Sequence, residues 1–186
     1  LADVLFGKVN PSGKLPFTFP VALKDNGAHA LNAYHPLDLS VEYKEGIYVG
    51  YRWAEKQNIK PLFAFGHGLS YTEFAYGEAR PSSSSVSFGG DFTVSVDVTN
   101  TGKLAGKEVV QLYIGDEESS LERPVKELKG FKKIALNPGE TKTVTFTIEP
   151  DMLKYFDDSK HEWVLESGKF TAYIGSASDD IRTKVD

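Results

Sequence analysis

Cysteine is absent from this 186-residue chain, and methionine occurs only once. The lack of cysteine excludes disulfides, thiolate metal sites, iron–sulfur clusters and a cysteine nucleophile, but it leaves the cellular compartment open. No run of residues approaches the roughly 18 apolar residues that a membrane-spanning helix needs. A surplus of positive charge is also missing, since the formal net charge is -5. This charge argues against nucleic acid as a partner.

Helical periodicity is scarce as well. Residues 1–7 (LADVLFG) are typical of the last turns of an amphipathic helix, with Leu1, Val4 and Leu5 on one face and Gly7 at its end. Starting a helix is costly, so a helix this short is marginal on its own. We therefore expect this chain to be the tail of a longer protein.

The next segments show no regular period. Residues 14–20 (KLPFTFP) predict an edge strand or an isolated extended segment, because Pro16 and Pro20 cannot donate hydrogen bonds to a neighbouring strand. Residues 21–40 are rich in Ala, Asn, Asp and His and predict a surface excursion.

Aromatic residues and glycines are interleaved between residues 43 and 74, and the rest of the chain is organised around this stretch. Residues 43–53 alternate loosely and predict a strand, followed by a polar turn at residues 55–61. Glycine lets the backbone turn or approach another surface, while aromatic side chains bring large apolar area. Two interpretations stay open: a strand pair packed under something larger, or a joint between two domains whose aromatic residues fill the seam.

Beyond Val86 the sequence period becomes two. Strand-like alternation recurs every ten to twenty residues, with turn signals such as residues 100–102 (NTG) and 137–139 (NPG) between the strands. This pattern predicts an antiparallel β-sandwich of the immunoglobulin or fibronectin type III kind over residues 75–186. We expect one helical turn there, at residues 150–155, and a flexible linker or hairpin tip at the serines of residues 82–85.

Several separated motifs resemble glycoside hydrolase family 3, the β-glucosidases and β-xylosidases. They are residues 3–7 (DVLFG), 10–20 (NPSGKLPFTFP), 43–53 (YKEGIYVGYRW), 65–72 (FGHGLSYT), 100–102, 106–113 (GKEVVQLY), 123–131 (RPVKELKGF) and 136–140 (LNPGE). The resemblance spans essentially the whole chain, in the family's order. It implies a mainly β chain in three parts: the C-terminal end of an α/β sandwich domain (1–40), an aromatic-rich connecting segment (41–74) and a fibronectin type III-like domain (75–186).

The resemblance also implies a function. Family members hydrolyse terminal, non-reducing β-D-glucosyl or xylosyl residues with retention, using two carboxyl groups and neither metal nor cofactor. Both carboxyl positions would precede Leu1, so we expect no catalytic, cofactor-binding or metal-binding residue here and no activity of the chain alone. The expected partners are the upstream catalytic domains, in the same polypeptide or as a separate chain, and the parent enzyme's oligo- or disaccharide substrate. A periplasmic or secreted protein is favoured over a cytoplasmic one. The alternative is a stand-alone β-sandwich module that binds carbohydrate or protein.

Several other residues are of types that can catalyse, bind metal or stack on sugar, and each has a simpler structural interpretation. Glu45 is expected to pair with Arg52 or a backbone donor, and His67 to be a hydrogen-bonded turn residue. The other histidines show no zinc-ligand spacing, the acidic clusters lack a calcium-loop pattern, and the tryptophans are expected to be buried rather than to stack on sugars. These residues are His29, His35, His161, Asp116, Glu117, Glu118, Asp157, Asp158, Trp53 and Trp163.

The remaining aromatic residues predict an interdomain seam. The sandwich fills its own core with strand valines and phenylalanines, so the aromatic residues of the connecting segment should pack against the upstream domains. Arginine offers five donors in a planar head and suits the rim of such a seam. The predicted seam residues are Arg52, Trp53, Phe63, Phe65, His67, Tyr71 and Arg123.

Overall fold

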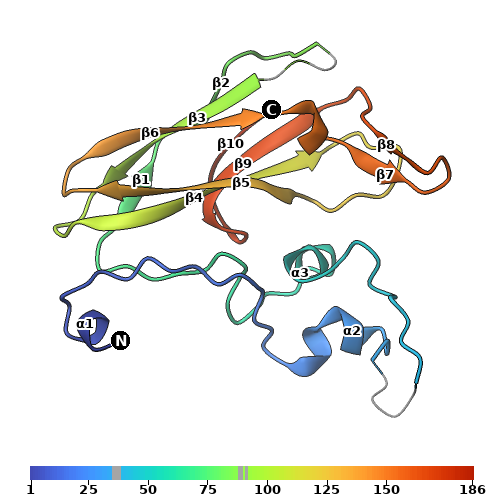
Figure 1. The fold of residues 1–186 in the computed structure, drawn as a ribbon, viewed down its shortest axis with the longest axis horizontal. Helices are drawn as coiled ribbons and strands as arrows, with labels where there is room; N and C mark the ends of the chain where they lie inside the picture. Colours follow the sequence, from blue (N-terminus) through green and yellow to red (C-terminus); the bar gives the residue numbers. More distant parts are fainter. Residues whose placement is uncertain (35–38, 88–89, 91) are drawn as a thin grey trace.

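The computed structural model describes residues 1–34, 39–87, 90 and 92–186. Of the histidines considered as zinc ligands, His35 lies outside the described residues. Figure 1 shows two layers: a β-sandwich built from the later two thirds of the chain, and the first 74 residues laid along one side of it. Among the described residues, no helix is long and apolar enough to cross a membrane.

The first sheet is centred on one long strand, β3. Strand β6 pairs with it antiparallel from Phe92↔Ile148 to Thr99↔Thr141. Two short strands share its other edge, β1 at Val98–Asn100 and β2 at Val94 and Ser95. The bounds are Phe74–Tyr76 for β1, Arg80–Pro81 for β2, Phe92–Asn100 for β3 and Thr141–Ile148 for β6.

The second sheet has the order β10-β9-β4-β5, all antiparallel. Its bounds are Gly106–Asp116 for β4, Glu127–Leu136 for β5, Phe170–Ala177 for β9 and Asp180–Val185 for β10. The β5–β6 turn carries the chain from this sheet to the first, and Gly139 takes the positive φ of 75° that this turn requires.

The sandwich core confirms the period of two. Alternate valines of β3 face alternate residues of β4 across the gap between the sheets, and β5, β6 and β9 complete the cluster. Its buried members are Val94, Val96, Val98, Val110, Leu112, Ile114, Leu136, Val144, Phe146, Ile148, Ala172 and Ile174. The mainly β fold and the sandwich are therefore as predicted from the alternation.

Two smaller features of the sandwich also follow the sequence. The expected helical turn is the 3-10 helix η2, Pro150–Met152. The serines of residues 82–85 lie in the connection between β2 and β3, which matches the hairpin-tip interpretation. A separate hairpin, β7 (Tyr155–Asp157) with β8 (Glu162–Val164), projects from the end of the sandwich (Figure 1).

Before β1, the helices and strands found among the described residues are all short helices. They are α1 (Ala2–Leu5), the 3-10 helix η1 (Leu23–Asp25), α2 (Gly27–Ala30) and α3 (Tyr51–Lys56). The predicted strand at residues 43–53 is wrong, because this stretch is a turn followed by α3. Gly46 and Gly50 have φ values of 57° and 65°, and these left-handed positions interrupt an extended chain.

Residues 14–20 and 62–67 run alongside each other and are called the ribbon below. Main-chain hydrogen bonds of 2.8 Å join Leu15 N to His67 O, Gly66 N to Leu15 O, and Phe19 N to Phe63 O. Phe19 and Phe63 form a single antiparallel bridge. The proline-bounded segment is thus extended and paired on one side, as an edge segment.

Candidate functional site

The ribbon lies on the outer face of the second sheet. Gln111 Nε2 donates to Gly66 O at 3.3 Å and to Ser176 O at 2.6 Å, and Ser178 N donates to Phe65 O at 2.9 Å. Lys14 Nζ reaches Glu108 Oε1 at 3.2 Å. Polar side chains on this sheet face therefore hold the ribbon, so β4 is covered on both faces.

Tyr51 joins helix α3 to the same sheet through aromatic contacts. Its ring stacks on Phe65 with centroids 5.1 Å apart and meets the Tyr113 ring edge-on at 5.8 Å. Its hydroxyl accepts a 2.9 Å hydrogen bond from Leu128 N on β5. Tyr113 is fully buried, although it sits on the face of β4 that points away from the sandwich core. The connecting segment thus completes an aromatic cluster outside the core.

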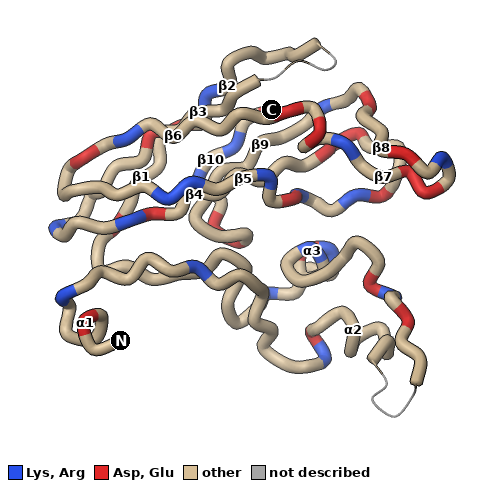
Figure 2. Tube along the Cα trace, viewed as in Figure 1, with Lys and Arg blue, Asp and Glu red and all other residues tan. Residues whose placement is uncertain are grey.

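Helix α3 also carries three charges that meet opposite charges on the loop before β5 and on the first residue of β5. Arg52 pairs with Glu127 at 2.8 Å, Glu55 pairs with Lys126, and Lys56 pairs with Glu122 at 2.7 Å. Positions i, i+3 and i+4 share one face of a helix, so the three contacts form one row, called the α3 ion pairs below. Figure 2 shows the basic positions of α3 where the helix approaches the sandwich. Helix α3 is therefore oriented on the sandwich by charge complementarity.

Arg123 is engaged within the sandwich. It contacts Asp116 at 3.4 Å and Glu127 at 3.1 Å, and its guanidinium lies 5.2 Å from the centre of the Tyr155 ring. Its side chain is only 10% exposed. The partners of Arg123 in this chain therefore belong to the sandwich itself, and its place at the rim of the seam stays a prediction. Arg52, by contrast, does anchor one part of the chain to another, since it links α3 to Glu127.

The carboxyl groups around Arg123 respond to burial and charge in different ways. Burial raises the pKa of Asp116, although Arg123 opposes the shift. Burial also acts to raise the pKa of Glu127, but the surrounding Lys129, Arg123 and Arg52 outweigh it and hold that pKa below its usual value. Glu127 is therefore a stable anion shared by three cations.

Arg123→Lys should destabilise the chain by about 1.5–3 kcal/mol, the usual worth of hydrogen bonds to charged groups. Lysine has one compact head and cannot reach both Asp116 and Glu127 in the geometry of the guanidinium. Urea denaturation followed by circular dichroism measures the change. Arg182→Lys is the matched control, because Arg182 is 45% exposed and its ion pair joins it to one carboxylate, Asp180, beside a 5.9 Å contact with the Tyr76 ring. Equal losses for the two variants would contradict a special role for Arg123.

The two tryptophans have different environments. Trp53 is 9% exposed and lines a cavity of about 30 Å³ together with Pro20, Gly27 and Ile59. Trp53 is therefore buried, as expected, and the residues that cover it belong to this chain; its contact with the upstream domains stays a prediction. Trp163 is 65% exposed and pairs edge-on with Phe156 across the β7–β8 hairpin, with centroids 5.7 Å apart. Its expected burial in a core is therefore wrong for the described part of the chain, and its burial in a seam stays a prediction.

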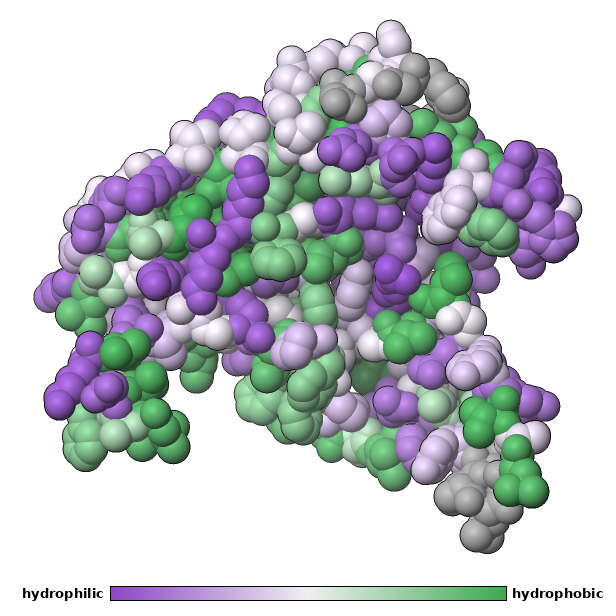
Figure 3. All heavy atoms as spheres, viewed as in Figure 1, coloured by the Kyte–Doolittle hydropathy of each residue, from purple (hydrophilic) through white to green (hydrophobic). Residues whose placement is uncertain are grey.

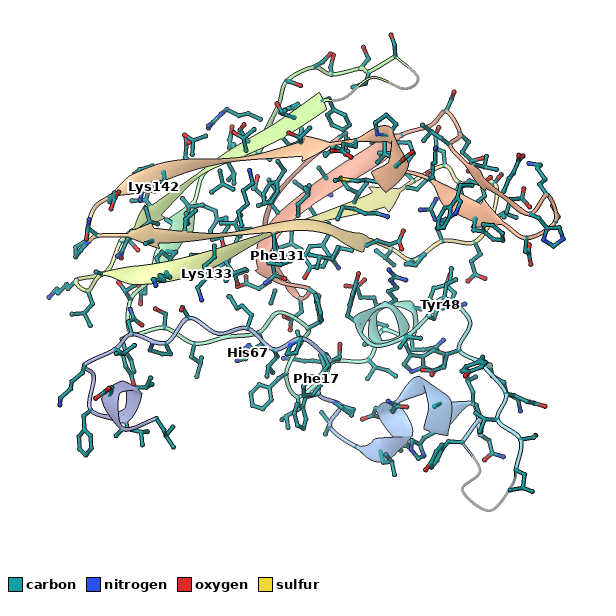
Figure 4. The ribbon with its side chains drawn as sticks, viewed as in Figure 1. Phe17, Tyr48, His67, Phe131, Lys133 and Lys142 are labelled. Atoms are coloured by element: carbon teal, nitrogen blue, oxygen red, sulfur yellow. The ribbon has the colours of Figure 1, made fainter. Side chains whose placement is uncertain are left out.

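The outer side of the ribbon presents a row of aromatic rings, called the aromatic stripe below. Phe17 and Phe19 lie 5.1 Å apart, Phe19 and Phe63 6.3 Å, and Phe63 and His67 5.1 Å. The three phenylalanines are 42–49% exposed. Figure 4 shows Phe17 on the side of the ribbon away from the sandwich. Tyr71, 47% exposed, is also on this layer, and it donates its hydroxyl to Val4 O of α1 at 2.8 Å.

The other candidate residues have structural environments. The Glu45 carboxylate lies against Gly27, where an added Cβ would come within 2.3 Å of it, and Arg52 pairs with Glu127 instead. His67 is a turn residue, whose N donates to Ala64 O at 3.1 Å. Asp157 accepts a hydrogen bond from the Ser159 hydroxyl at the β7–β8 tip. This hydrogen bond and the nearby Lys160 together lower the pKa of Asp157 to about 2. Among the described residues no group of three or more acidic or histidine side chains could hold a metal ion.

Exposed apolar side chains are concentrated in the first 74 residues. Of the twenty-five large hydrophobic residues that the described chain leaves exposed, eighteen belong to this part and seven to the longer sandwich. Figure 3 shows hydrophobic residues gathered over this layer, below the more hydrophilic strands. Large contiguous apolar patches mark interaction surfaces. The layer therefore has one face on the sandwich and a second face suited to contact with other protein.

Comparison with known proteins explains this two-sided layer. Residues 1–71 match the glycosyl hydrolase family 3 C-terminal domain, and residues 108–178 match the fibronectin type III-like domain. The chain belongs to glycoside hydrolase family 3. It corresponds to the C-terminal portion of its members, as the resemblance predicted.

Individual relatives of this family 3 chain are β-glucosidases. Beta-glucosidase BoGH3A of Bacteroides ovatus is 54% identical over 100% of the chain and 25% of its own length, and thermostable beta-glucosidase B of Acetivibrio thermocellus is 54% identical over 99% and 24%. The GH3 beta-glucosidase structure from Bifidobacterium adolescentis superposes with a TM-score of 0.91 at 34% identity, covering 100% of this chain and 27% of that one. The chain thus spans about a quarter of the length of these relatives.

Sequence reasoning missed part of this site. The sequence predicts a strand up to Trp53 and a turn from Glu55, so it shows neither the α3 ion pairs nor the packing of Tyr51 against the buried Tyr113. One signal is present in residues 109–114 (VVQLYI). The positions that alternate with the core residues, Val109, Gln111 and Tyr113, are also large or carry an amide. A strand of that kind is typical of a sheet covered on both faces.

Proposed function

We propose that this chain is the structural C-terminal portion of a retaining β-glycosidase of the β-glucosidase type, and that its first 74 residues pack against the catalytic domains. The observation that carries the proposal is the exposed apolar face of that layer, including the aromatic stripe. Support comes from the relatives, which are β-glucosidases about four times longer than the part matched here. The substrate class is a terminal, non-reducing β-D-glucosyl or xylosyl group.

The buried carboxylates of the chain support a structural role. A retaining glycosidase needs two carboxyl groups about 5–5.5 Å apart, one acting as nucleophile and the other as acid and base. Here the inward-facing carboxylates Glu55, Glu108, Asp116 and Glu127 are each bound to a lysine or an arginine. Such neutralised pairs hold layers together and leave no protonated acid opposite a free nucleophile.

The chain alone should hydrolyse no 4-nitrophenyl β-D-glucoside or β-D-xyloside above background, whereas the full-length protein should do so. Nucleophile and general acid together account for most of the acceleration in such enzymes, and we place both in the preceding part. Release of nitrophenolate is the measurement. Turnover by the isolated chain that Glu45→Gln abolishes would contradict the proposal and make Glu45 catalytic.

A stand-alone sandwich that binds carbohydrate or protein is the second candidate. It accounts for residues 75–186 but not for eighteen exposed hydrophobic residues in the layer beneath them. The size of the native polypeptide separates the two: a native 20.5 kDa protein would favour the module. We also propose the three-part division at residues 40/41 and 74/75, supported at the second boundary by β1, which enters the sandwich at Phe74.

A further inference from the structure

One segment of the layer is more exposed than the rest. Residues 39–44, called the arm below, lie between α2 and α3, and every one of them is exposed. Leu39 is fully exposed, Val41 is 58% exposed and Tyr43 is 95% exposed. Figure 1 shows this part of the chain passing outside α2 and α3, away from the two sheets. The arm therefore presents three large apolar side chains that the sandwich does not cover.

Described residues on both sides of the arm in sequence are buried, and those that follow it contact α2 and α3. Before it, Ala33 is buried, and after it, Tyr48 is 8% exposed. Lys56 of α3 lies 3.7 Å from the centre of the Tyr48 ring while pairing with Glu122 of the sandwich loop. The Glu45 carboxylate packs against Gly27 of α2 so closely that no Cβ fits there. The exposed residues thus lead directly into a segment that is held by α2 and α3, and the position of that segment depends on the α3 ion pairs.

The sequence of the arm has the period of a strand, and no strand pairs with it among the described residues. Apolar Leu39, Val41 and Tyr43 alternate with Ser40, Glu42 and Lys44, so an extended arm has one apolar and one polar edge. On the polar edge Glu42 and Lys44 form a 2.8 Å ion pair, so burying the other edge leaves no charge unpaired. An extended segment of this kind can add to a sheet edge or lie in an apolar groove.

We propose that the arm docks, by its Leu39–Val41–Tyr43 edge, onto the catalytic part that precedes this chain in the same polypeptide. The inference rests on the proposed function. That part accounts for about three quarters of the length of the relatives. The arm belongs to the same layer as the aromatic stripe, so one partner reaches both. Because the arm is rooted on α3, and α3 is paired to the sandwich, this contact couples the sandwich to the catalytic part.

Photo-crosslinking in the full-length protein tests the docking directly. Tyr43 is replaced by p-benzoylphenylalanine, the protein is irradiated, and linked peptides are identified by mass spectrometry. We expect links from position 43 to peptides upstream of Leu1. The matched control is the same replacement at Phe131, which is 66% exposed on β5 of the sandwich, and it should give no such links. Links between two copies, links only to the sandwich, or no links at position 43 would each overturn the inference.

A third probe separates this inference from the proposed function. The photo-reactive residue at Phe19 tests the aromatic stripe, which belongs to the docking face whether or not the arm does. Upstream links from position 19 with none from position 43 would overturn the arm and leave the proposed function standing. No upstream links from either position would overturn both. As an independent readout, Tyr43→Ser should lower the Tm of the full-length protein by several degrees and leave that of the 186-residue chain unchanged.

Discussion

Trp53→Ala should destabilise the 186-residue chain itself by about 3–5 kcal/mol, the usual cost of truncating a buried tryptophan. The side chain is 9% exposed and lies among Pro20, Gly27 and Ile59, where α3 meets the segments before and after it. The loss should appear first in α3. Since 1.4 kcal/mol is a factor of ten in an equilibrium constant, amide exchange at Ala54 and Gln57, both hydrogen-bonded within α3, should quicken about 10²- to 10³-fold.

Trp163→Ala is the matched control for this experiment. The indole of Trp163 is 65% exposed on the β7–β8 hairpin, so its removal should cost under about 1 kcal/mol, the scale of a cross-strand aromatic pair. Hydrogen exchange and urea denaturation on both variants give the comparison. If Trp53→Ala leaves the isolated chain unchanged and weakens only the full-length protein, Trp53 belongs to the docking face and the local burial described here is incorrect.

The sandwich could be predicted from the sequence because the alternation of buried and exposed residues can be read within each strand by itself. A strand with one buried face shows alternation by itself, and the valines of β3 and the core positions of β4 follow that alternation residue by residue. The turns at residues 100–102 and 137–139 contain asparagine and glycine, whose preferences hold in most contexts. Strand order and pairing then follow a small set of antiparallel arrangements.

The layer beneath the sandwich could not be predicted in the same way, because its order comes from contacts distant in sequence. Helix α3 has six residues, too few to give a clear period of 3.6 or to be stable alone. It is held by Glu122, Lys126 and Glu127, some seventy residues later in the chain, which no local pattern connects to it. Trp53 looked like a seam residue because the sequence gives no sign that Pro20 and Gly27 return to cover it.

Lys126→Ala should be among the most destabilising single changes at the junction of layer and sandwich. Lys126 is 7% exposed and pairs with Glu55, whose side chain is 19% exposed. Removing one partner of a buried pair leaves the other charge uncompensated, which costs about 3–5 kcal/mol. The double replacement Glu55→Leu with Lys126→Met removes both charges and should stay close to the wild-type stability. Urea denaturation of the three variants measures the pair; a double variant as unstable as Lys126→Ala would show that packing, and not charge, is responsible.

The pH dependence of Lys126→Ala identifies the cause of its instability. Burial raises the pKa of Glu55 above its ordinary value of 4.5, and Lys126 opposes that shift. A carboxyl group with a raised pKa in the folded state stabilises the fold fully below its unfolded pKa, and this contribution is lost as the pH rises through the folded pKa. Without Lys126 the folded pKa of Glu55 rises further, so the penalty of the variant should be largest at neutral pH and shrink as the pH falls toward 4.5. Denaturation midpoints of wild type and variant between pH 4.5 and 8 give the difference. A penalty that does not change across this range would show that the ionised Glu55 is not its source, and would refute the electrostatic account of how helix α3 is held to the sandwich.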